Sequence, residues 1–265
     1  IGSAVLGSLI SYYVYFTYGY NGVIVTIFTI ISGISAGIII IYPFLSRKFN
    51  RRQLSKICLA MIIFGYAAML IVGLLWHDKS SVYLIAVCAA FPSIGQGIYY
   101  MVLTIGITNT VEYNEFKTGK RDEGIIFSLR PFMAKMASAL LMGIIAIVFG
   151  ILNVADITKA MSNIENSAAL GTITSDQKAT EIANIIATVP EETKQWLLVC
   201  MTVLPIIFLT IAIVIFLRKY KIDETYYGYI LKEIDAKKAR NLADNSDLIS
   251  VDNCETEKLD TAENI

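Results

Sequence analysis

The sequence has 265 residues, of which 55% are hydrophobic and 17% are charged. Soluble domains usually carry about a quarter charged residues, so this composition argues against a soluble globular protein. The 22 basic and 22 acidic residues cancel to a net charge of zero, which gives no reason to expect a nucleic-acid partner.

Charged residues are absent from residues 1–46, 80–111 and 195–217. A membrane-spanning helix needs about 20 mostly apolar residues, and each of these stretches is long enough for at least one. We therefore predict an all-α membrane protein with six transmembrane helices. They cover residues 1–18, 23–45, 54–76, 82–108, 124–151 and 196–217.

The first predicted span begins within an apolar run and has no initiator methionine. We read this as a truncated chain, and expect six further spans in a missing N-terminal half.

The connections between the spans sort by charge. Short basic loops at residues 47–52, 117–121 and 218–221 are expected in the cytoplasm by the positive-inside rule. Trp76 and Trp196 fall at the opposite interface, where indole rings are enriched. The prediction is a multi-pass protein of the cell membrane with both ends of this chain in the cytoplasm.

Three polar segments complete the domain organisation. Residues 152–194 are expected to form an external loop with a surface helix around 175–186. Residues 218–240 are predicted to form a cytoplasmic amphipathic helix, and the acidic residues 241–265 are predicted to be disordered.

Two helix faces carry polar side chains at steps of three and four residues. One contains Ser93, Gln96, Tyr100 and Thr104, and the other contains Tyr12 and Tyr15, with serines one turn before. In a bilayer such faces point to a bundle interior or a wet cavity. Helix–helix packing through hydroxyl bonds is the alternative, and either stripe alone leaves both open.

The fifth span contains Lys135, eleven residues past its start and so roughly 16 Å deep at 1.5 Å per residue. A lysine at that depth costs about 2.5–3.5 kcal/mol, so it needs a partner or a wet cavity. Ser128 and Ser138 share its face, and a structural ion pair is the alternative role. Arg130 lies nearer the cytoplasmic end, about 140° around the helix, and is expected to reach the inner interface.

Residues 109–140 (NTVEYNEFKTGKRDEGIIFSLRPFMAKMASAL) resemble the glycoside–pentoside–hexuronide:cation symporters, the melibiose-permease-like branch of the major facilitator superfamily. The basic loop 43–52 resembles a motif that the wider superfamily repeats in each half, and the tail stretch 219–237 resembles the C-terminal segment of the symporter family. The resemblance covers the C-terminal half of the fold only, so the chain is expected to form one six-helix half of a major-facilitator transporter.

This resemblance implies cation-coupled symport of a sugar or glycoside, driven by Na⁺ or H⁺, through alternating access. It implies that Lys135 faces the central cavity and couples the two substrates, with Tyr100 near the sugar. The cation is expected at carboxylates of the missing half, so no metal site and no cofactor are expected here. The cytoplasmic gate is expected to include Asn109, Glu112, Tyr113, Glu115, Arg121 and Arg130. Asn109 stands where the family usually has Asp.

The sequence leaves two other functions open and disfavours a third. A lipid or other amphiphile symporter of the same superfamily and a membrane sensor that binds without transporting both stay open. A membrane enzyme is disfavoured, because one histidine and four scattered cysteines supply neither a nucleophile–base pair nor a metal cluster.

Overall fold

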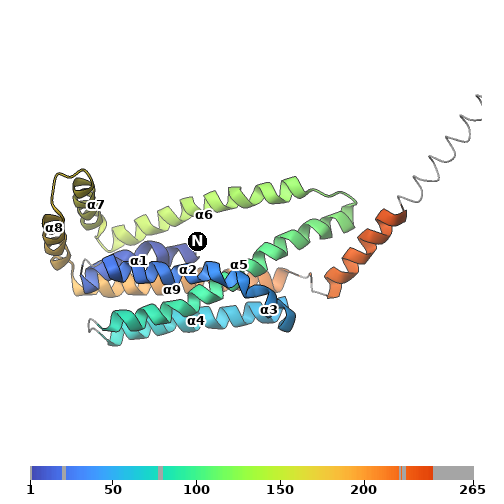
Figure 1. Ribbon diagram of the computed structural model, residues 1–265, viewed down its shortest axis with the longest axis horizontal. Coiled ribbons are helices and arrows are strands. Elements are labelled where there is room, and N and C mark those ends of the chain that lie inside the picture. Colours follow the sequence, from blue (N-terminus) through green and yellow to red (C-terminus); the bar gives the residue numbers. More distant parts are fainter. Residues whose placement is uncertain (1, 20–21, 77–79, 221, 223–224, 241–265) are drawn as a thin grey trace, which may run out of the picture. The chain divides into compact units, whose positions relative to one another are not determined.

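The computed structural model describes residues 2–19, 22–76, 80–220, 222 and 225–240 (Figure 1). These residues contain no strand. The acidic segment 241–265 lies outside them. The helices, in chain order, are α1 (Gly2–Tyr18), α2 (Gly22–Gly37), the 3₁₀ turn η1 (Ile38–Ile40), α3 (Tyr42–Lys48), α4 (Arg51–Leu75), α5 (Ser81–Thr118), α6 (Glu123–Ile151), α7 (Ala155–Ala169), α8 (Ser175–Ala187) and α9 (Glu191–Lys219). A further helix covers residues 225–240.

Four of the described helices are long and apolar enough to cross a membrane: α4, α5, α6 and α9. Six spans are predicted from the sequence. The first of them corresponds to α1, which has 17 residues and is slightly shorter than the roughly 20 that a bilayer requires. The second corresponds to α2, which has only 16.

The segment 23–45, expected as one continuous helix, is divided in the structure. The α-helix ends at Gly37, a 3₁₀ turn follows, and α3 begins with Pro43 in its first turn. Proline donates no backbone hydrogen bond and disfavours helical geometry at the residue before it. The apolar pattern continues across this break, so hydropathy alone does not reveal it.

The longest helix, α5, extends well beyond its predicted end. α5 continues to Thr118, ten residues past the predicted 108, and stops where Gly119 adopts a positive φ of 72°. Glycine adopts this left-handed conformation without strain, and a helix that ends in this way can satisfy its last free carbonyl groups with backbone hydrogen bonds. The predicted external loop contains α8 close to the expected surface helix, and also α7, which the sequence analysis did not identify.

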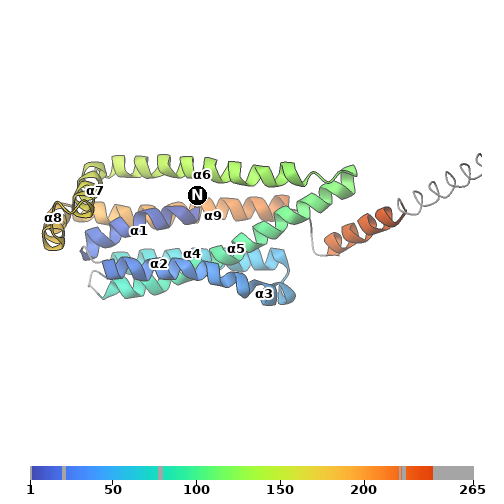
Figure 2. The same cartoon turned by 45° about the horizontal axis from the view of Figure 1, so that its top comes forward.

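The described chain forms two compact units. Unit 1 comprises Ile1–Thr104 and Ser128–Lys221, and unit 2 comprises Ile105–Phe127 and Ile222–Ile265. Within unit 1, α9 packs against both α1 and α4 (Figures 1 and 2). α8 also contacts α1 and continues into α9 after a short turn.

Close approach of α4 and α5 depends on two glycines. A Cβ added at Gly65 would lie 2.2 Å from Pro92 Cδ, and one added at Gly95 would lie 3.0 Å from the Cys58 carbonyl oxygen. Small residues allow helix backbones to pack closely inside membranes. The polar face of α5 is therefore positioned by tight contacts along its neighbour.

Candidate substrate-binding site

The first two residues of the predicted α5 stripe form hydrogen bonds within α5 and to α4. Ser93 is buried, and its hydroxyl donates to the Ala89 carbonyl at 2.9 Å. The Gln96 amide Nε2 donates to the Tyr66 hydroxyl at 2.7 Å. These two residues fit the packing alternative, because their polar atoms are used in hydrogen bonds within the helix pair.

The last two residues of the stripe, Tyr100 and Thr104, contact the side chain of Arg130 in α6. The Arg130 guanidinium donates to the Tyr100 hydroxyl at 2.5 Å and to Thr104 Oγ1 at 3.5 Å. Its Cζ lies 5.6 Å from the centre of the Tyr100 ring. This arrangement combines a charge-assisted hydrogen bond with a cation–π contact.

Arg130 is predicted from the sequence to belong to the cytoplasmic gate, and that prediction stays open. Its contacts are with Tyr100 and Thr104, the two residues predicted to face the substrate. Helical spacing places residues on one face of a helix but does not specify which neighbouring helix that face meets. We refer to Tyr100, Thr104 and Arg130 as the α5–α6 cluster.

Lys135 lies five residues further along α6 and is exposed in unit 1. Among the described residues it forms no ion pair. Ser128 and Ser138 are exposed as well, and the Ser138 hydroxyl donates to the Ala134 carbonyl at 3.1 Å. The structure thus leaves the Lys135 ammonium available on the α6 surface.

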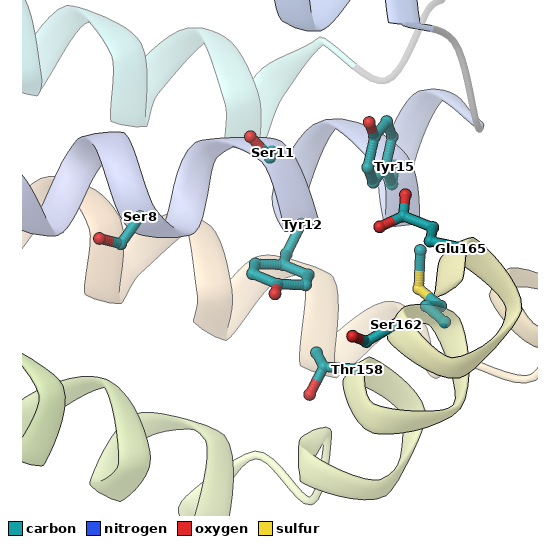
Figure 3. A pocket seen from close by; sticks show the side chains of 8 residues that line it. Ser8, Ser11, Tyr12, Tyr15, Thr158, Ser162 and Glu165 are labelled. Carbon is teal, nitrogen blue, oxygen red and sulfur yellow. The ribbon is translucent and has the colours of Figure 1, made fainter. Parts of the chain in front are cut away.

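The α1 stripe lines a cavity of about 290 Å³ together with α7. Figure 3 shows Tyr12 and Tyr15 projecting from α1, with polar side chains of α7 opposite them. Neither Tyr100 nor Lys135 lines this cavity. The lining residues are Ser8, Ser11, Tyr12, Tyr15, Thr158, Met161, Ser162 and Glu165.

The other predicted gate residues lie in unit 2. The Glu115 carboxylate forms ion pairs with the Arg121 guanidinium, at an N–O distance of 3.2 Å, and with the Lys238 ammonium, at 3.0 Å. Glu112 accepts a hydrogen bond from the Tyr227 hydroxyl. The hydrogen bond from Arg121 to Glu123, 2.6 Å long, is the largest cause that raises the pKa of the guanidinium.

Aromatic side chains join the same two segments of unit 2. The ring centroids of Tyr113 and Tyr226 are 6.4 Å apart, and those of Phe116 and Tyr229 are 6.2 Å apart. Asn109 is buried, with 2% of its surface exposed. Segment 105–127 and helix 225–240 therefore form one packed unit that contains five of the six predicted gate residues.

Sequence reasoning missed several residues that the structure brings into these sites. Tyr66 belongs to an apolar stretch in which a single tyrosine gave no signal. Thr158, Ser162 and Glu165 follow helical spacing, but they lie in a segment read as a loop. Among the described residues, no three His, Cys, Asp or Glu side chains are grouped closely enough to hold a metal ion.

Arginine and lysine are rare inside membrane-spanning helices, and where they occur, as Arg130 and Lys135 do in α6, they commonly mark a substrate or ion pathway. A family model described as MFS/sugar transport protein matches residues 1–224. The chain belongs to this family, and the predicted membership in the sugar symporters of the major facilitator superfamily is confirmed.

Three relatives show how far the similarity extends. A raffinose carrier protein from Pediococcus pentosaceus is 31% identical over 147 residues, which are 55% of this chain and 22% of the relative. A lactose permease from Lactobacillus delbrueckii subsp. bulgaricus is 35% identical over 132 residues, covering 48% of this chain and 20% of the relative. An uncharacterised symporter from Bacillus subtilis is 36% identical over 108 residues, covering 38% and 22%. The chain matches about a fifth of the length of each relative.

Proposed function

We propose that the chain is one half of a secondary transporter that carries a sugar or glycoside together with a cation. Membership in the sugar transport family supports this proposal, as do relatives named as a raffinose carrier and a lactose permease. The complete transporter would contain a second six-helix half and work by alternating access, with the two halves rocking about a site near the bilayer midplane.

The observation that carries the proposal is the α5–α6 cluster, together with a second cation, Lys135, in the same helix as Arg130. Two long apolar helices bring a tyrosine ring, a threonine hydroxyl and a guanidinium together. Hydroxyl groups and charged donors can bond sugar hydroxyls, and an aromatic face can pack on the apolar side of a pyranose ring. The cost of placing cations within such helices is consistent with a functional role.

In this mechanism Arg130 orients Tyr100 toward the sugar, and Lys135 responds to the coupling cation. Lys135 pairs with a carboxylate of the missing half, where Na⁺ or H⁺ binds as the co-substrate. None of the six predicted spans contains Asp or Glu, which is why we assign the cation to that other half.

Unit 2 would form the wall of an inner gate, with its ion pairs exchanging as the transporter opens. This proposal places residues 47–52 and 117–121 in the cytoplasm. Single cysteines at Ser46, Thr118 and Thr174 test it with an impermeant thiol reagent on intact cells. Labelling at Thr174 alone is expected, and labelling at Ser46 or Thr118 without Thr174 would reverse the topology.

The transport proposal itself is tested by sugar counterflow in proteoliposomes. The protein is the complete open reading frame that contains this chain, co-expressed with the N-terminal half if the two are separate chains. Exchange of labelled for unlabelled lactose or raffinose is expected. A sensor would bind sugar without exchange, and exchange of an amphiphile in place of a sugar would favour a lipid carrier.

A further inference from the structure

The α1–α7 cavity is built from two helix faces with the same spacing. On each helix the lining residues occupy positions i, i+3, i+4 and i+7, which place side chains on one face. The α1 face presents Ser8, Ser11, Tyr12 and Tyr15, and the α7 face presents Thr158, Met161, Ser162 and Glu165. The match is a property of both segments, so the cavity is not a gap left by one irregular loop.

Packing within unit 1 holds α7 in this position. Val154, just before α7, is fully buried, and Met161 is 3% exposed. The ring of Tyr12 meets Phe149 edge-to-face, with centroids 5.2 Å apart. Phe149 lies in the last turn of α6, two residues before that helix ends. The contact therefore holds the chain that leads into α7 against α1.

The side chains that line the cavity indicate which class of ligand it can bind. The described residues that line the cavity include no lysine, arginine or histidine, which argues against an anion. A volume of about 290 Å³ with a single carboxylate among the described lining residues does not suit a bare metal ion, which needs several oxygens at short distances. The volume is close to the lower limit of the roughly 300–1,000 Å³ typical of small-molecule sites.

What remains is a neutral ligand rich in hydroxyl groups. Ser8, Ser11 and Ser162 can donate or accept hydrogen bonds, and the Glu165 carboxylate accepts only. The Thr158 hydroxyl donates to the Ala155 carbonyl at 3.0 Å, so toward a ligand it is an acceptor. Figure 3 shows Ser162 and Thr158 facing the side of the cavity where the Tyr12 ring lies.

We propose that the α1–α7 cavity is a second saccharide site, separate from the α5–α6 cluster, in which Glu165 accepts hydrogen bonds from sugar hydroxyls and Tyr12 packs against the ring. The inference rests on the proposed function only in that the protein handles sugars. The site holds one monosaccharide unit. Because α7 supplies half of its lining, this helix contributes to the choice of sugar.

The test is equilibrium binding of lactose and raffinose to the purified 265-residue chain in lipid nanodiscs. Glu165→Gln keeps the shape of the side chain and replaces one acceptor oxygen with an amide. It should weaken binding of the preferred sugar about tenfold, as expected for loss of a hydrogen bond to a charged group. Ser162→Ala should weaken binding by a smaller factor. Glu181→Gln, on the exposed surface of α8 and outside the cavity lining, is the matched control and should bind like the unmodified chain.

Each outcome decides the proposal. Weaker binding for Glu165→Gln together with unchanged binding for Glu181→Gln supports it, even if counterflow by the complete protein fails. Loss of binding in Lys135→Leu with none in Glu165→Gln would overturn the second site and leave the transport proposal intact. A helical chain, checked by circular dichroism, that binds neither sugar at its highest soluble concentration also overturns the second site.

Discussion

Removing the contact between Arg130 and Tyr100 by substitution tests the α5–α6 cluster directly. Hydrogen bonds to charged groups contribute about 1.5–3 kcal/mol, and a cation–π contact at an exposed site contributes about 0.5–1 kcal/mol. Tyr100 is 54% exposed, so we take the low end of both ranges. Arg130→Gln should therefore destabilise the cluster by about 2 kcal/mol, which corresponds to a factor of about 30 in an equilibrium constant.

A double-mutant cycle isolates this contact from other effects of the substitutions. Tyr100→Phe removes the hydroxyl and keeps the ring, so the coupling energy with Arg130→Gln should be about 1.5 kcal/mol. The free energy of unfolding can be measured by titration with sodium dodecyl sulfate in mixed micelles. Tyr83→Phe, at an exposed position in the first turn of α5, supplies the control cycle with a coupling near zero. Coupling energies that agree for Tyr100 and Tyr83 to within about 0.3 kcal/mol would refute the assignment.

The remaining predictions concern other parts of the chain. Lys135→Leu in the complete protein should abolish cation-driven sugar accumulation and leave membrane insertion intact, because it removes an insertion cost. Gly65→Ala should lower the free energy of unfolding of the purified chain by about 1–3 kcal/mol, and with it the melting temperature, because the added methyl group overpacks against the proline ring of α5. Gly143→Ala on α6 has open space at its Cβ and should lower neither. Tyr227→Phe should speed amide hydrogen exchange in helix 225–240, because a hydrogen bond to segment 105–127 is lost.

Each of these has a result that contradicts it. Normal accumulation with Lys135→Leu would remove this residue from the coupling mechanism. Equal melting temperatures for the two alanine variants would show that α4 and α5 are not in close contact. Unchanged exchange in helix 225–240 would mean that its packing does not depend on the tyrosine hydroxyl.

Hydropathy predicts the long helices well because each has an uninterrupted apolar run. α4, α6 and α9 begin and end within five residues of the predicted bounds. It fails where a helix break occurs inside an apolar run, as at Pro43, and where a helix continues into polar sequence, as in α5. It also misses α7, because a short amphipathic helix is stabilised mostly by tertiary packing.

The candidate site was predictable in composition but not in grouping. Helical spacing identifies which residues share a face of one helix, and so it identifies the α1 and α5 stripes. It does not specify the partner helix, so neither the contact of Arg130 with Tyr100 nor the place of Glu165 in the cavity follows from it. Tyr227 and Lys238 lie more than 100 residues from Glu112 and Glu115 along the chain, so only the tertiary structure brings them together.

Cation-coupled sugar transport is the central claim, and uptake into proteoliposomes tests it most directly. The complete protein is reconstituted, a Na⁺ or H⁺ gradient is imposed, and labelled lactose or raffinose inside the vesicles is measured over time. We expect accumulation above the external concentration with one of the two gradients, and its collapse when an ionophore removes that gradient. Equilibration of the sugar without accumulation under either gradient would contradict coupling, and exclusion of both sugars from protein-containing vesicles would contradict lactose or raffinose transport.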